Sequence, residues 1–138
     1  MQFRVRSYSM CGFMNGNDTE EQSLAGNNPA FANRHKDTGI KEPSQAIVFV
    51  EEGPTLDDGH FGFSPNLPGD TGFGGWSWVN APAFYYNGFT TPFSFADGHA
   101  EMHEWLDAQT RTITTAGQAD TSTDHADITW MKLHIYPR

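Results

Sequence analysis

Residues 93–105 are Phe-Ser-Phe-Ala-Asp-Gly-His-Ala-Glu-Met-His-Glu-Trp, and this stretch decides the fold. Apolar and polar residues alternate on both sides of a central Asp97-Gly98 pair, and such a pair is a turn signal of β-hairpins. The pattern therefore predicts two antiparallel strands, Phe93–Ala96 and His99–Leu106, with Asp97 in the tight turn between them. A chain that contains such a hairpin needs at least a small sheet to bury its apolar side chains.

The second strand of this hairpin carries polar side chains at every other position. Successive side chains of a strand point to opposite faces, so we expect His99, Glu101 and His103 to share one face. Two imidazoles and a carboxylate can bind a metal ion, and they can also perform acid–base catalysis. Alternating polar residues are equally typical of a solvated strand face, and the sequence leaves these alternatives open.

The rest of the chain indicates short strands joined by long ordered loops. Residues 3–10 alternate like a first strand, and residues 45–52 have the β-branched density of a central strand covered on both faces. Residues 55–92 are rich in Gly, Pro, Asn and Asp, while residues 128–136 fit either a closing strand or a short helix. We therefore expect one α+β domain over residues 1–138, with a small antiparallel sheet and little helix.

The composition excludes several classes of protein. The chain has 17 acidic and 8 basic residues and a net charge of −9, which argues against nucleic acid and anionic membranes as partners and suits the binding of cations. No apolar run approaches the roughly 18 residues that a transmembrane helix needs. The single cysteine, Cys11, excludes an internal disulfide, and we expect it to be a buried, inert thiol.

Acidic side chains gather where the predicted central strand ends. Glu51, Glu52, Asp57 and Asp58 lie in a loop that also contains glycine, and Ca²⁺ prefers about six to eight oxygen ligands from such loops. The same pattern is expected of a turn whose carboxylates hydrogen-bond to their own backbone. Further carboxylates follow in turn-rich surroundings, and they matter for calcium only if the fold brings them together: Asp70, Asp120, Asp124 and Asp127.

The chain resembles the C-terminal region of prepilin-type, processing-associated proteins, a pseudopilin-like family with a histidine nine residues before an Asp-Gly pair. Ten residues separate Tyr86 from Asp97 here, and Tyr86 stands where the family has the histidine. The sequence also lacks the family's apolar N-terminal helix, so we expect either the globular head alone or a relative with another task. The resemblance rests on residues 93–105 and, in order along the chain, on residues 6–13, 48–52, 57–61, 80–88 and 124–130.

This resemblance implies an antiparallel pseudopilin-like head, pilin-like protein partners and a place in the cell envelope or outside the cytoplasm. Related pseudopilins hold Ca²⁺ in a loop near the C-terminal sheet. The resemblance therefore favours a calcium site with Asp58 and Asp97 as leading ligands. The other candidates are Asp124, Asp127 and Glu52.

Two further functions compete with a calcium-binding structural domain of a secretion or pilus assembly. One is a small Ca²⁺-dependent hydrolase of an ester or lactone, in which His99 or His103 is the general base, Glu101 assists, and the cation polarises the carbonyl. The other is a carbohydrate-binding module that stacks sugars on loop aromatics. The aromatics in question are Trp76, Trp78, Tyr85 and Tyr86.

Overall fold

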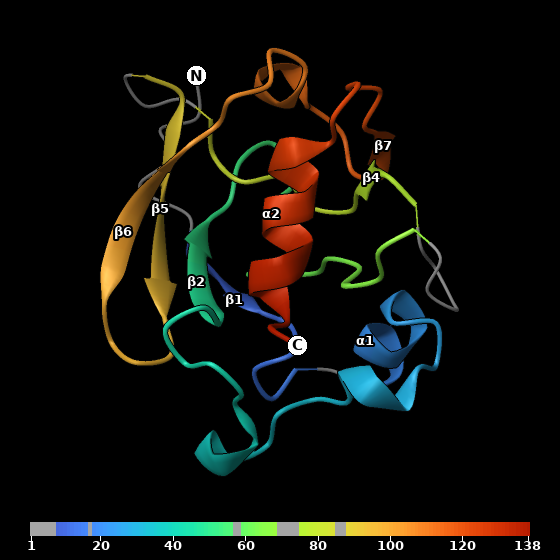
Figure 1. The fold of residues 1–138 in the computed structure, drawn as a ribbon, viewed down its shortest axis with the longest axis vertical. Coiled ribbons are helices and arrows are strands. Elements are labelled where there is room, and N and C mark those ends of the chain that lie inside the picture. Colours follow the sequence, from blue (N-terminus) through green and yellow to red (C-terminus); the bar gives the residue numbers. More distant parts are fainter. Residues whose placement is uncertain (1–7, 17, 57–58, 69–74, 85–87) are drawn as a thin grey trace.

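The computed structural model describes residues 8–16, 18–56, 59–68, 75–84 and 88–138. A five-stranded sheet with the order β3-β1-β2-β5-β6 forms one layer, and helix α2 lies across one of its faces (Figure 1). The sheet strands are β1 (Tyr8–Cys11), β2 (Ile47–Glu51), β3 (His60–Phe61), β5 (Thr90–Phe95) and β6 (Ala100–Glu104). The other elements are α1 (Asp18–Leu24), α2 (Ala126–Ile135), the paired strands β4 (Ser77–Trp78) and β7 (Gln118–Ala119), and the 3₁₀ turns Pro29–Phe31, Asp37–Gly39 and Thr110–Thr112.

This arrangement confirms an α+β fold with a small sheet, but the sheet is mixed. Neighbouring strands are antiparallel except for β1 and β3, which pair in parallel through Met10 with His60 and Cys11 with Phe61. A parallel pair needs a long crossover, and the residues between β1 and β3 supply it through α1 and β2. The prediction of a wholly antiparallel sheet is therefore wrong at this edge.

The hairpin of β5 and β6 forms where the sequence predicts it. Phe93 lies opposite Glu101 and Thr91 lies opposite His103. The turn between the strands places Gly98 at φ 95°, in the left-handed region that glycine adopts without strain. Strand β6 is the outer edge of the sheet, so its side chains have a neighbouring strand on one side only.

Helix α2 resolves the ambiguity of residues 128–136 in favour of a helix. Its buried apolar residues Ile128, Met131 and Ile135 recur at spacings of three and four, which place them on one helical face. The helix packs on the inner face of the sheet, where the carbonyl of Ile135 accepts a hydrogen bond from the Cys11 thiol at 3.6 Å. Burial raises the pKa of this thiol to about 12, as expected for an inert core cysteine.

Strand β2 is central in the sheet, as predicted, but only one of its faces is covered. Ile47 and Val50 are fully buried on the inner side, whereas Phe49 on the outer face remains 45% exposed. The expectation of a strand covered on both faces is therefore wrong. No described helix is both long and apolar enough to cross a membrane. The first part of the predicted strand 3–10 lies outside the described residues.

Candidate functional site

The three predicted catalytic residues lie on or beside β6, on the face that turns toward α2. Glu101 and His103 pair with Phe93 and Thr91, which are both buried in the core, so their face is the inner face of the sheet. His99 lies just before β6, two residues from Glu101 on the same alternation. Of the alternatives left open by the sequence, a solvated strand face describes the Glu101 end, which is exposed, whereas His103 is half-buried.

His103 is packed as an aromatic side chain. Its ring stacks on Trp130 of α2 at 3.6 Å between centroids and meets the edge of Trp105 at 4.6 Å. Burial lowers the pKa of His103 to about 4; the charge of Asp127 opposes this shift and that of His134 adds to it. The imidazole is consequently neutral at pH 7, and its buried Nε2 has no hydrogen-bond partner among the described residues.

A second histidine, His134, also stacks on the indole of Trp130. The His134 ring lies 4.1 Å from the Trp130 ring, nearly parallel to it, and its Nδ1 donates to the Trp130 carbonyl at 2.7 Å. Trp130 thus stacks on two imidazoles.

Asp97 and His99 are the two predicted site residues that are in direct contact. The Asp97 Oδ1 lies 2.6 Å from His99 Nδ1 and also accepts a hydrogen bond from the His99 backbone N–H at 3.1 Å. The hydrogen bond from the imidazole lowers the pKa of Asp97. The His99 ring also stacks on Phe95 at 4.4 Å, so the pair is held in an orientation that a general base uses.

This pair does not converge with the other predicted catalytic groups. His99 and His103 are four residues apart on one strand face, and such positions are separated by about 13 Å. The described residues contain no group of three or more His, Cys, Asp or Glu side chains that could hold a metal ion. The arrangement can therefore orient one exposed imidazole, but it does not assemble the predicted trio around a single point.

The predicted calcium ligand Glu52 is a buried structural acceptor. Its Oε2 accepts from the Ser9 hydroxyl at 2.6 Å, and its Oε1 accepts from Thr55 Oγ1 at 2.8 Å and Asn80 Nδ2 at 2.9 Å. These bonds connect β1, the end of β2 and the loop before residue 82. Glu52 thus fixes three segments to one another.

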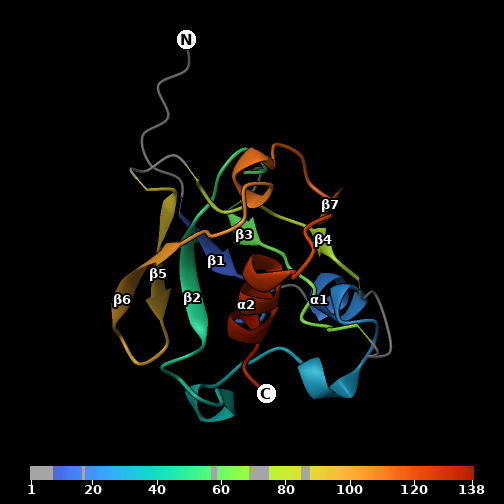
Figure 2. The same ribbon diagram turned by 45° about the horizontal axis from the view of Figure 1, so that its top comes forward.

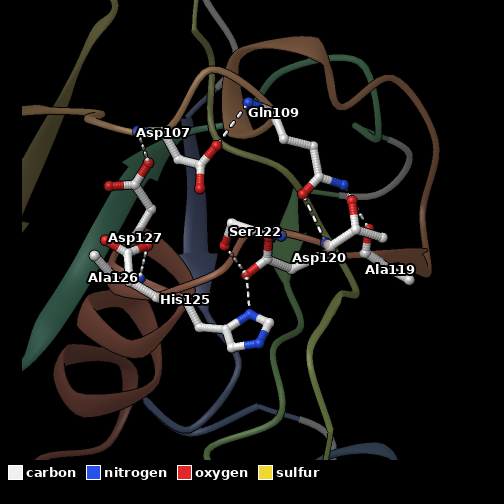
Figure 3. A network of polar contacts seen from close by, with 10 residues as sticks. Asp107, Gln109, Ala119, Asp120, Ser122, His125, Ala126 and Asp127 are labelled. Carbon is white, nitrogen blue, oxygen red and sulfur yellow. Dashed lines mark hydrogen bonds and ion pairs between the residues drawn. The ribbon is translucent and has the colours of Figure 1, made fainter.

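Asp127 has a similar structural task at the start of α2. Its two oxygens accept the backbone N–H groups of Leu106 at 3.1 Å and Asp107 at 2.9 Å (Figure 3). Asp124 is exposed and accepts from the Ala126 N–H at 3.4 Å. Asp58, the remaining calcium candidate, lies outside the described residues.

An aspartate–histidine pair at the start of α2, with Asp120 buried and His125 partly exposed, was not predicted from the sequence. His125 Nδ1 lies 2.8 Å from Asp120 Oδ2, which also accepts the Ser122 hydroxyl at 3.0 Å (Figure 3). The His125 ring stacks on Trp76 at 4.2 Å, and its backbone has φ 52°. The Asp120-x-Ser122 spacing predicts a local turn. The contact with Trp76 involves a segment distant in the sequence, so no pattern in the residues around His125 predicts it.

All six histidines of the chain are therefore used by the fold. Four contact carboxylates: His35 with Asp18, His60 with Glu21, His99 with Asp97, and His125 with Asp120. The other two, His103 and His134, stack on Trp130. The aromatic residues considered for sugar stacking are also engaged, because Trp78 is fully buried and Trp76 is covered by His125, while Tyr85 and Tyr86 lie outside the described residues.

Comparisons with protein-family models, curated proteins and solved structures find no match for this chain.

Proposed function

We propose that this chain is a pseudopilin-like head domain with a structural role, which acts by packing against copies of itself. The observation that carries this proposal is the open outer face of the five-stranded sheet, opposite α2. Tyr8, Phe49 and Met102 are 49%, 45% and 55% exposed on this face. Cross-strand pairing places Met10 beside Phe49 and Pro92 beside Met102, so the five side chains belong to one surface, which we call the outer face.

The charge distribution favours a second copy as the partner. A chain with net charge −9 repels its own kind over most of its surface. On the outer face the five named side chains are uncharged, and the exposed carboxylate of Glu104 lies at its β6 edge, two residues from Met102, so charge repulsion between two outer faces is confined to that edge. Two sheets that pack face to face by a twofold axis bury the same apolar residues from both sides. Exposed apolar patches of this kind mark interaction sites.

Self-association is therefore expected in sedimentation velocity, and it should strengthen as salt screens the repulsion between chains, for example from about 50 to about 500 mM NaCl. The double change Phe49→Ser with Met102→Ser removes four large apolar side chains from each dimer. We expect it to weaken association by at least about 100-fold. Leu133→Ser on α2, where the leucine is 39% exposed, is the matched control and should leave association unchanged. Equal sedimentation of all three proteins as monomers contradicts the proposal.

The calcium part of the proposal is supported by the acidic composition and by the family resemblance of the segments around Asp58 and Asp97. If Ca²⁺ binds only the folded chain, the thermal midpoint should rise by roughly 5–10 °C in saturating Ca²⁺ relative to chelator. Asp58→Asn should abolish this rise, whereas Glu20→Gln, at an exposed position on α1, should retain it. Identical midpoints in Ca²⁺ and in chelator would contradict calcium binding. They would not bear on self-association through the outer face.

A further inference from the structure

A polar pocket lies beside α1, and none of its lining residues is among the candidate site residues predicted from the sequence. Its volume is about 520 Å³, and it is lined by Ala32 and six polar residues: Asp18, Thr19, Gln22, Asn27, Asn33 and His35. Helix α1 and strand β6 lie on opposite sides of the molecule in both views (Figures 1 and 2). The pocket is therefore distinct from the β6–α2 region and from the outer face.

Hydrogen bonds fix the polar groups of this pocket before any ligand arrives. Asn33 Nδ2 donates to Asp18 Oδ1 at 2.6 Å and to the Gly16 carbonyl at 3.2 Å. The two ring nitrogens of His35 face Asn15 Oδ1 at 2.9 Å and Asp18 Oδ1 at 3.2 Å. Preorganised side chains of this kind lower the entropic cost of binding.

The chemistry of the lining selects among ligand classes. Amides and a hydroxyl dominate it, and these groups both donate and accept hydrogen bonds. A phosphate or carboxylate only accepts, and it would meet the Asp18 carboxylate in a pocket lined by no lysine or arginine. An ammonium group only donates, so it matches Asp18 alone and leaves the amide N–H donors of the lining unused; Asn33 and His35 already contact the Oδ1 of that carboxylate. Ala32 is the one apolar lining residue, which excludes a mainly apolar ligand.

We infer that this pocket binds a neutral polyhydroxylated molecule of the size of a mono- or disaccharide. Hydroxyl groups match its mixture of donors and acceptors. Asn33 lines the pocket, and its Oδ1 is buried with no hydrogen-bond partner among the described residues, so a ligand hydroxyl satisfies this costly unpaired acceptor once the amide turns toward the pocket. Binding by hydrogen bonds without an aromatic platform is weak, with a Kd of roughly millimolar order.

The test is a titration of the ¹⁵N-labelled chain with glucose, galactose, N-acetylglucosamine, maltose and glycerol, followed by amide chemical shifts. At least one sugar should give saturable shifts confined to residues 18–35. Asn27→Gly removes an amide while keeping the backbone at its φ of 57°, which glycine tolerates. This change and Asn33→Ala should each raise the Kd by about fivefold or more.

Gln45→Ala is the matched control, because Gln45 is an exposed amide outside the pocket. It should bind sugar like the unchanged chain. The inference is overturned if no sugar gives saturable shifts, if Asn27→Gly binds as well as the unchanged chain, or if inorganic phosphate or spermidine binds at these residues in place of sugars. None of these outcomes affects self-association through the outer face, so the two proposals fail separately.

Discussion

Gly12→Ala is expected to lower the free energy of unfolding by about 3–5 kcal/mol. A Cβ atom at position 12 would overlap the Glu21 carboxylate and His60 Nε2. These two side chains are in contact, with Glu21 Oε1 2.5 Å from His60 Nε2, and the Glu21 side chain is only 1% exposed. The alanine methyl group has no space unless this pair separates.

Separation of the pair is costly because it leaves Glu21 buried without its partner. Burial raises the pKa of Glu21, and the contact with His60 works against that shift, so the histidine is what stabilises the carboxylate in the interior. The pair also connects α1 to β3, two elements separated by most of the N-terminal half of the chain. Gly12→Ala is therefore expected to weaken the packing of α1 together with the ion pair.

Urea unfolding followed by tryptophan fluorescence measures this effect. Gly39→Ala is the matched control, because a Cβ at position 39 has no heavy atom within 4 Å and the backbone there is not left-handed. Its midpoint should stay within the small range expected for a compatible Gly→Ala change, about 1 kcal/mol or less. Equal midpoints for Gly12→Ala and Gly39→Ala would show that the interior accommodates the methyl group.

Local sequence patterns predict the hairpin of β5 and β6 well, and they predict distant contacts poorly. The alternation of residues 93–105 and the Asp97-Gly98 turn require only neighbouring residues, and both are confirmed. The parallel pairing of β1 with β3 depends on a crossover through α1 and β2, which leaves no periodic signal. The mixed sheet was missed for this reason.

The candidate site shows the same division between local and distant information. The spacing of His99, Glu101 and His103 correctly places them on one strand face. It contains nothing about Trp130, which lies in another element and makes His103 part of the aromatic packing. Likewise, the carboxyl group of Asp127 looks like a metal ligand until the backbone of residues 106 and 107 is seen to occupy both of its oxygens.

Acidification is expected to destabilise the chain through His103, and the sign follows from its environment. In the folded chain burial holds the pKa of His103 at about 4, whereas an unfolded histidine has a pKa near 6.5. Between these values the unfolded chain binds more protons, so stability falls as the pH decreases from about 6.5 to about 4. The full difference corresponds to about 3 kcal/mol, and solvent screening of a half-buried ring reduces it to roughly 2 kcal/mol.

His103→Phe isolates this contribution, because phenylalanine keeps a planar ring against Trp130 and Trp105 but cannot bind a proton. Between pH 7 and pH 4, the free energy of unfolding should fall by roughly 2 kcal/mol less in this variant than in the unchanged chain. His35→Gln is the control, since His35 is an exposed histidine paired with the exposed Asp18, and it should retain the steep pH dependence. Parallel pH profiles for the unchanged chain and His103→Phe would mean that His103 accepts its proton in the folded state, and that the stack around Trp130 tolerates a charge.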